Sequence, residues 1–321
     1  MSKAAKVWLI VAASLVLLGV LIVGGVMMFL KFDFGSFITS KCQTNTHEIS
    51  EEFNSISVNT STADISFLVS EDGGRRVVCY EQENLKHSVE VRDGTLFVSL
   101  VDTRKWYEHI SIYSENPMVT VYLPKAEYAA LTVRTSTGDV GISAELSFER
   151  IDINASTADV KCYASATGEV KIKTSTGDIF AEGLSAGSLD LSVTTGKVKV
   201  SSVSCSGDVK LESDTGDIEL SGVSCKNIIS EGETSDISLL NVIAKERFSI
   251  KTDTGDIKFD RCDASEMFIE ADTGDVTGSF CSDKIFFAQS DTGRIDVPRT
   301  TSGGRCEITT DTGDIRLWVV Q

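Results

Sequence analysis

The sequence predicts an all-β protein: a single-stranded β-solenoid, or β-helix-like fold, of coils of about 19–20 residues, preceded by one N-terminal transmembrane helix. A short phrase, cleanest at 253–257 (Asp-Thr-Gly-Asp-Ile), recurs at that spacing to the C-terminus. Val, Ile, Thr and Ser crowd the region after residue 50, and the whole chain holds only 3 Pro, which is typical of β-rich proteins. A long uncharged apolar run precedes this region.

The apolar run covers residues 7–30 and contains Ser14 as its one appreciably polar side chain. At ~1.5 Å per residue it spans ~36 Å, enough for a hydrocarbon core of roughly 30 Å. A cleaved signal peptide has a shorter apolar segment, of about 7 to 15 residues, followed by small residues at the cut. We therefore expect a single membrane anchor.

The basic residues that flank the run differ little between its two sides. A first transmembrane helix usually has its N-terminus in the cytoplasm, which favours a cytoplasmic N-terminus (1–6) and an extracytoplasmic remainder. Residues 31–48 are expected to be a juxtamembrane linker with three interfacial phenylalanines. Cys42 lacks the small preceding residues that a lipidation site needs.

Residues 49–130 predict an irregular, β-rich N-terminal part of the ectodomain. Apolar and polar side chains alternate in short runs, and 72–74 (Asp-Gly-Gly) and 93–94 (Asp-Gly) divide these runs as turns. The segment 102–117 is less regular and is expected to be a variable surface loop. Its Trp106 and Tyr107 would favour glycan binding if they formed an exposed aromatic stripe.

Residues 131–321 predict the regular solenoid. We call the last polar position of the phrase the corner position. Thr stands two residues before it in every copy, Val or Ile follows it, and the residue eight before it is always apolar. The corner residues are Asp139, Asp159, Asp178, Lys197, Asp217, Asp236, Asp256, Asp275, Arg294 and Asp314.

Such repetition indicates coils that stack on copies of themselves, with equivalent residues ~4.8 Å apart. An antiparallel sandwich also turns about every ten residues, but it does not require the same residue at the same phase in every second strand. We expect the last residues, 315–321, to form the terminal coil, with Trp318 as a plug over the core; the alternative for Trp318 is an aromatic platform for a ligand.

From Asp214 onward an additional acid precedes the Thr in every copy, so the later coils, apart from the one with Arg294, carry two acids per corner. A purely structural role is enough to explain the phrase, because Gly adopts backbone angles that other residues avoid and Asp accepts hydrogen bonds from the backbone amides of a turn. Calcium bridging between coils is the sharper hypothesis, which a calcium-dependent rise in melting temperature would test. The candidate ligands are Asp214, Asp217, Asp253, Asp256, Asp272, Asp275, Asp311 and Asp314. No other cofactor is expected.

Two cysteine pairs, Cys205 with Cys225 and Cys262 with Cys281, fall at equal phase in neighbouring coils. They would stack within reach of a disulfide, or equally as small buried apolar residues. No spacing typical of a zinc site occurs.

Catalysis finds little support, since the three histidines lie outside the repeats and no nucleophile or metalloprotease motif is present. We expect no catalytic residues. The net charge of −17 argues against nucleic acid as a partner. A polysaccharide-active enzyme would need two carboxylates about 5 to 9.5 Å apart in a cleft.

The apolar N-terminal segment followed by repeated Ser/Thr-Thr-Gly-Asp-Ile/Val phrases resembles the bacterial adhesin-like toast-rack β-strand-repeat family, over roughly residues 48–321. The resemblance implies a β-solenoid sensor or interaction module of the cell envelope, associated with stress signalling, and no catalytic residues. Our first hypothesis is therefore a non-enzymatic membrane-anchored module that binds an envelope protein. The second is an adhesive or glycan-binding rod.

Overall fold

The structure, a computed structural model, describes residues 3–29, 42–104 and 116–320. The chain divides into two units, of which the first contains α1 (Lys3–Phe29) and the second contains the strands. Within α1, residues 5–25 have a mean hydropathy of 2.8 and none of them is buried. A helix of this length and composition serves as a membrane anchor or as a signal sequence. The expected linker residues 31–41, with their phenylalanines, lie outside the described residues.

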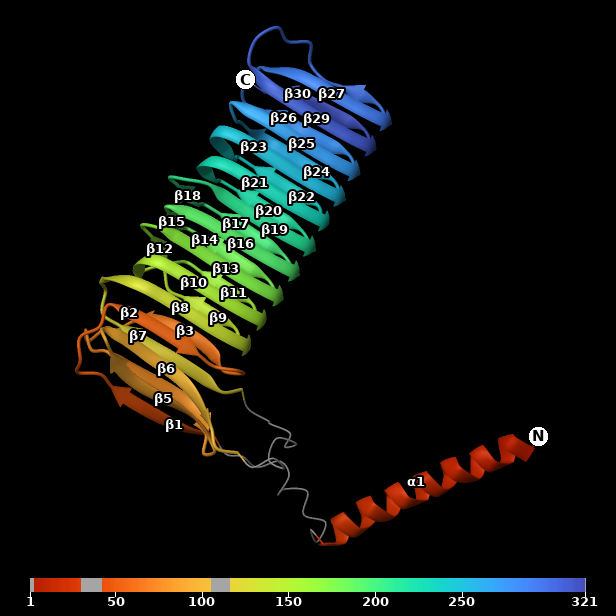
Figure 1. The fold of residues 1–321 in the computed structure, drawn as a ribbon. Coiled ribbons are helices and arrows are strands. Elements are labelled where there is room, and N and C mark those ends of the chain that lie inside the picture. The colour runs from red at the N-terminus through yellow and green to blue at the C-terminus, as the bar shows by residue number, and fades with distance from the viewer. Residues whose placement is uncertain (1–2, 30–41, 105–115, 321) are drawn as a thin grey trace. The chain divides into compact units, whose positions relative to one another are not determined.

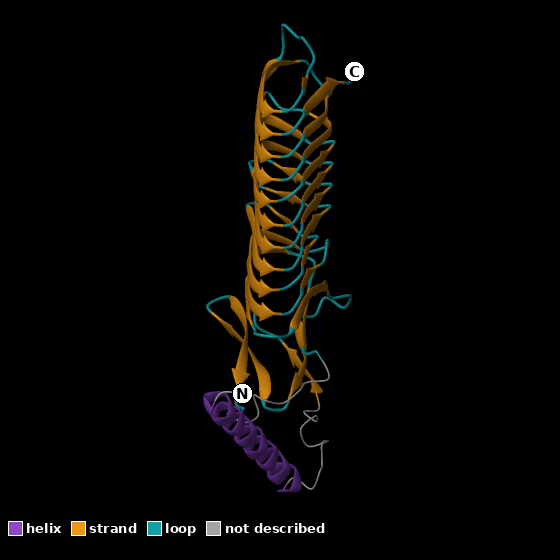
Figure 2. Ribbon diagram, turned by 90° about the vertical axis from the view of Figure 1, so that its right-hand side faces the viewer, coloured by secondary structure: helices purple, strands orange, loops and turns teal. Residues whose placement is uncertain are grey.

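The strand unit is a stack of parallel coils, each formed by a long strand, a corner and a short strand (Figure 1, Figure 2). The long strands make one continuous face, because equivalent residues of successive coils pair in register. In spatial order they are β6 (Thr95–Asp102), β2 (Ser55–Asn59), β8 (Glu127–Thr137), β10 (Ser147–Thr157), β13 (Glu169–Thr176), β16 (Ser188–Thr195), β19 (Val209–Thr215), β21 (Ser224–Thr234), β23 (Ile243–Thr254), β25 (Glu266–Thr273), β29 (Gly304–Thr312) and β27 (Lys284–Thr292).

The short strands make the opposite face in the same order. They are β7 (Met118–Leu123), β3 (Asp64–Val69), β9 (Val140–Ile142), β11 (Val160–Cys162), β14 (Ile179–Glu182), β17 (Val198–Ser201), β20 (Ile218–Ser221), β22 (Ile237–Leu240), β24 (Ile257–Cys262), β26 (Val276–Phe280), β30 (Ile315–Val319) and β28 (Ile295–Asp296). Two-residue strands line a third side in some coils: β12 (Ser165–Ala166), β15 (Ser185–Ala186) and β18 (Ser204–Cys205). The prediction of a β-solenoid is confirmed.

The core runs along the stack as ladders of equivalent apolar residues. The position eight before the corner is fully buried from Leu131 to Met267, and so is the residue after the corner from Val140 to Val276. One coil cannot enclose these side chains alone, so each coil depends on its neighbours for burial. Period-two alternation in the sequence therefore identified the inward face.

The N-terminal end of the strand unit is closed by antiparallel strands. Here β5 (Leu85–Arg92) pairs with β6, while β4 (Arg76–Gln82) pairs with β7 and with β1 (Cys42–Glu48). Residues 42–48, expected to be linker, thus form an edge strand of this cap. The β2–β3 coil lies between the β6–β7 coil and the β8–β9 coil, although both β6 and β7 follow it in the chain.

The C-terminal end has a similar exchange of order. The last coil of the chain, β29–β30, lies between β25–β26 and β27–β28, so β27–β28 ends the stack. The prediction that 315–321 would end the stack was wrong, and so was the plug: Trp318 is 50% exposed. It lies on β30 beside Ser279, and its alternating position turns it outward between the buried Leu317 and the half-buried Val319.

Candidate functional site

The corner residues form a hydrogen-bonded ladder along one edge of the strand unit. In most coils, the corner aspartate accepts a hydrogen bond through Oδ1 from the backbone N–H of the next corner residue, as Asp256 does from Asp275 at 3.0 Å. The ladder begins at Asp64, whose Oδ1 accepts from the N–H of Asp139 at 2.9 Å. It ends where Asp314 accepts from Arg294 at 2.8 Å.

These hydrogen bonds stabilise the charged form of the stacked acids. The N–H of Asp275 is the main cause of the lowered pKa of Asp256, and the N–H of Arg294 plays the same part for Asp314. Lys258 and Arg316 add ion pairs to these two carboxylates. Amide donors and ion pairs thus offset the repulsion between like charges about 5 Å apart.

The two basic corner residues now have a structural explanation. Arg294 belongs to the coil that ends the stack, where no further backbone N–H needs an acceptor. Lys197 lies in the middle and pairs with Glu219 at 2.8 Å and with Asp217 at 3.5 Å. At this corner, ion pairs from the Lys197 ammonium group to the following coil therefore take the place of the hydrogen bond that a corner aspartate accepts.

The calcium hypothesis stays a prediction. The additional acids, Asp214, Asp253, Asp272 and Asp311, are exposed at the same edge as Asp217, Asp256, Asp275 and Asp314. Within the described residues, no acidic corner brings three carboxylate, imidazole or thiolate groups within 4.8 Å of one another. A calcium ion there would need backbone carbonyls or water for most of its six to eight ligands.

All of the cysteines are free thiols in this structure. The expected stacking of Cys262 on Cys281 is not observed, because a register shift between β24 and β26 places Cys262 opposite Phe280. Cys205 and Cys225 are buried on neighbouring coils, whose preceding residues, Ser204 and Ser224, pair directly. Cys262 is buried, whereas Cys281 is exposed and donates its backbone N–H to the Cys262 carbonyl. Burial raises the pKa of Cys225 to about 12 and of Cys262 to about 11. These two thiols are therefore poor nucleophiles.

A buried polar network in the N-terminal cap escaped the sequence analysis. Glu81 Oε2 accepts from both the backbone N–H (2.6 Å) and Nδ1 (2.8 Å) of His87, and Oε1 accepts from Asn45 Nδ2 at 2.6 Å. The other ring nitrogen of His87 lies 2.9 Å from Thr60 Oγ1. With Cys79, the pair forms the one group among the described residues that places three metal-ligating side chains within 4.8 Å.

This network is a structural tie rather than a reactive site. Glu81 and His87 have side chains 1% exposed, so solvent and substrates do not reach them. Burial, followed by the charge of Glu81, raises the pKa of Cys79 to about 12. The signal in the sequence was Glu81 itself, which occupies an inward position of an otherwise apolar alternation.

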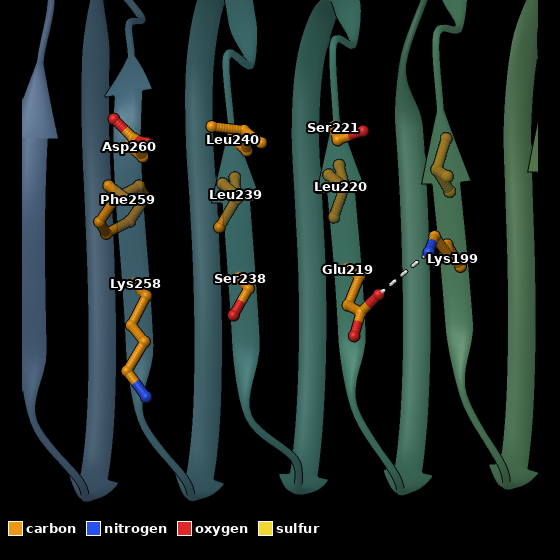
Figure 3. Close-up of a pocket in the computed structure, with 11 residues that line it drawn as sticks. Lys199, Glu219, Leu220, Ser221, Ser238, Leu239, Leu240, Lys258, Phe259 and Asp260 are labelled. Atoms are coloured by element: carbon orange, nitrogen blue, oxygen red, sulfur yellow. Dashed lines mark ion pairs between the residues drawn. The ribbon is translucent and has the colours of Figure 1, made fainter.

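A shallow groove of about 480 Å³ crosses the short-strand face over β17, β20, β22 and β24. Figure 3 shows the lining side chains in parallel rows across the strands, and one of these rows contains Lys199, Glu219, Ser238 and Lys258. Lys199 lies 3.7 Å from Glu219, whose pKa is lowered mainly by a hydrogen bond from Lys197. The lining contains no histidine or cysteine.

Arginine and phenylalanine side chains alternate on the outward long-strand face near the C-terminal end. Arg247 lies 5.0 Å from the ring centre of Phe268, and Arg305 lies 5.8 Å from Phe268 and 5.4 Å from Phe287. Phe287 is 55% exposed. Trp106 and Tyr107, expected to favour glycan binding, lie outside the described residues.

Comparison with known proteins identifies the fold. The family model described as Toastrack DUF4097 matches residues 53–215 and 207–321. A solved putative adhesin from Bacteroides fragilis is 16% identical over 87% of this chain and 98% of its own, with a TM-score of 0.41. A putative lipid binding protein from Parabacteroides distasonis is 16% identical over 85% and 96%, with a TM-score of 0.48. No curated protein matches the chain.

Proposed function

From the premise that the chain belongs to the Toastrack DUF4097 family, we propose that it is a non-enzymatic interaction module of the cell envelope. In this proposal α1 anchors the protein in the membrane with its N-terminus in the cytoplasm. The strand unit lies on the extracytoplasmic side and binds an envelope protein, either in stress signalling or as a surface scaffold.

One observation carries the proposal: the two ends of the strand unit differ. The first described strand after α1, β1, is an edge strand of the cap. The opposite end, at β27–β28, has no such cap and exposes apolar side chains. An anchored rod that presents an uncapped end is suited to binding rather than to enclosing a substrate.

The charged side chains support a role without catalysis. Along the long-strand face, acids and bases of successive coils form ion pairs, such as Lys251 with Glu270 at 2.7 Å and Arg247 with Glu266 at 3.1 Å. Of the described histidines, His87 is buried in the cap network. Paired surface charges and buried polar groups leave few groups poised for proton transfer.

An adhesive or glycan-binding rod is the second candidate, favoured by the Arg247–Phe268–Arg305–Phe287 face. Exposed aromatic rings and guanidinium groups bind sugar rings and anionic substituents through stacking and hydrogen bonds. The open short-strand groove with Lys199 and Lys258 offers a further surface for an extended chain.

Labelling of Cys281 tests the location of the strand unit. Cys281 is exposed, so a membrane-impermeant maleimide applied to intact cells should label it if the strand unit is extracytoplasmic. The variant Cys281→Ser serves as the control for labelling at other cysteines. Labelling at Cys281 only after the cells are permeabilised would contradict the proposal.

Capture with the intact chain then distinguishes the two candidates. The full-length protein, in detergent, is incubated with envelope extract and its bound material is recovered. A membrane signalling or scaffold protein supports the first candidate. Recovery of a glycan, weakened by Phe268→Ala and not by the mid-rod control Phe180→Ala, would support the second and replace the first.

A further inference from the structure

The coil that ends the stack, β27–β28, has a neighbouring coil on one side only. Among the described strands, β27 pairs with β29 alone and β28 with β30 alone. Each strand therefore has a free edge, where backbone N–H and C=O groups have no neighbouring strand. Such an edge is a template for another strand.

Apolar side chains accompany this free edge. Ile285, Phe287 and Ile295 are 37%, 55% and 46% exposed. Phe286 packs on Phe280 at a ring separation of 6.2 Å but is only half-buried, whereas Cys306, at the same position in the next coil, is fully buried. The core thus continues to this end without being covered there.

The loop 297–303 covers only the start of β27. Val297 packs against the core and Thr300 donates a hydrogen bond to the Lys284 carbonyl. Figure 2 shows this loop at the end of the stack beside the C-terminus. No described strand lies beyond residues 285–292, so most of the edge stays open.

The charge at this end differs from that of the chain as a whole. Residues 281–303 contain three acids and three bases and are neutral, while the whole chain carries −17. Side-by-side contact between two copies is opposed by repulsion, but contact through this end is not. The same end of a second copy is also neutral, and it offers a free strand edge whose backbone groups can hydrogen-bond with those of the first copy.

We propose that this end is a self-association surface, at which two copies of the chain join end to end through an antiparallel pair of their β27 strands. A two-fold axis near Ala288 places Phe286 of one copy opposite Ser290 of the other, so a large inward side chain faces a small one. Antiparallel pairing also brings the Arg294 corner of one copy beside the segment that holds Asp283 in the other. The two cores then become continuous.

The capped N-terminal end limits the assembly to a dimer. Its antiparallel strands β1, β4 and β5 differ from β27 in direction and composition, and a two-fold contact uses the same surface on both copies. The contact is therefore closed and does not propagate into a fibre. This inference concerns the strand unit alone and stands whether or not α1 crosses a membrane.

Site-specific photo-cross-linking tests the contact in the purified full-length chain in detergent. p-Benzoylphenylalanine replaces Phe287 in one variant and Phe180, an outward residue of β14 in the middle of the stack, in the control. We expect a covalent dimer from position 287 only, with the cross-linked peptide within residues 284–292. No dimer, or a cross-link to another surface, would overturn the proposal, as would a cross-link only to a different protein when envelope extract is added.

Sedimentation of charge variants provides the second test. Phe287→Lys places two like charges beside the proposed axis and should weaken dimerisation at least tenfold, without lowering the melting temperature. Leu240→Lys, at a comparably exposed position (39%) of the stack, should leave dimerisation unchanged. Equal association of both variants would show that any dimer forms elsewhere, for example through α1, and would overturn the proposal.

Discussion

The carboxylate of Asp64 accepts a hydrogen bond from the backbone N–H of Asp139, 75 residues further along the chain, at 2.9 Å. Residues 61–65 (Ser-Thr-Ala-Asp-Ile) are an isolated early copy of the repeated phrase. The contact joins this copy to the first coil of the regular series. The intervening chain forms the β6–β7 coil and the antiparallel cap on the other side of β2–β3. The corner ladder is therefore continuous in space where the repeats are interrupted in sequence.

Gly255→Ala should destabilise the strand unit by about 1–3 kcal/mol or more, because Gly255 has a φ of 144° and a Cβ there would lie 2.2 Å from the Ser235 carbonyl oxygen. Denaturant unfolding measures the change. Gly141→Ala is the matched control, since a Cβ at Gly141 meets nothing within 4 Å. Equal stability of the two variants would show that the coil corners tolerate a side chain.

Asp256→Ala should lower the free energy of unfolding by about 0.5–1.5 kcal/mol, because it leaves the N–H of Asp275 without its acceptor. Asp256→Asn keeps an oxygen acceptor and should recover part of the loss. Asp253→Ala, an exposed acid three residues earlier, controls for the change in net charge. A loss as large for Asp253→Ala as for Asp256→Ala would assign the effect to charge alone.

Acid should abolish the contribution of Asp256. Its pKa is lowered from 3.8 in the folded state, chiefly by the Asp275 N–H, so the stabilisation is fully present above 3.8 and is lost as the pH falls through the lowered value. The difference in unfolding free energy between wild type and Asp256→Ala, measured from pH 7 to pH 2, should stay constant and then shrink below about pH 4. A difference that grows on acidification contradicts this assignment.

Alkylation at pH 8 should modify Cys281 first in the native protein. Cys281 is exposed, whereas Cys79, Cys162 and Cys306 are buried and have pKa values raised to about 12 by desolvation. Mass spectrometry of digests after iodoacetamide treatment identifies the labelled residues. In denaturant all thiols should react, and fast native labelling of Cys162 or Cys306 would be inconsistent with a closed core.

Glu81→Ala should cost about 3–5 kcal/mol, because it leaves His87 and Asn45 in the buried cap without their shared acceptor. Glu90→Ala removes a partly exposed partner of Arg92 and should change stability by less than about 1 kcal/mol. Thermal melts of the two variants make the comparison. The network would be of little consequence if both melted at the wild-type temperature.

The sequence by itself determined the coil. Thr254 and Ile257 recur at fixed phase, so the position of each corner and the inward residues Phe248 and Ile257 followed from periodicity, and the structure buries both. Alternation alone could not assign a partner to Glu81, because it distinguishes inward from outward positions and does not say which polar groups meet inside.

Only the tertiary structure decided the order of the coils at the two ends. Nearly every corner offers the same carboxylate and every corner the same N–H, so in the pattern Asp275 could precede Arg294 or Asp314 equally well. In the fold its carboxylate accepts a hydrogen bond from the N–H of Asp314. Because the repeated phrase fixes the phase of a coil but not its neighbour, the sequence could not show that 284–296 ends the stack. Because the last coil of the chain lies inside the stack, Phe287 rather than Trp318 lies beside the free edge.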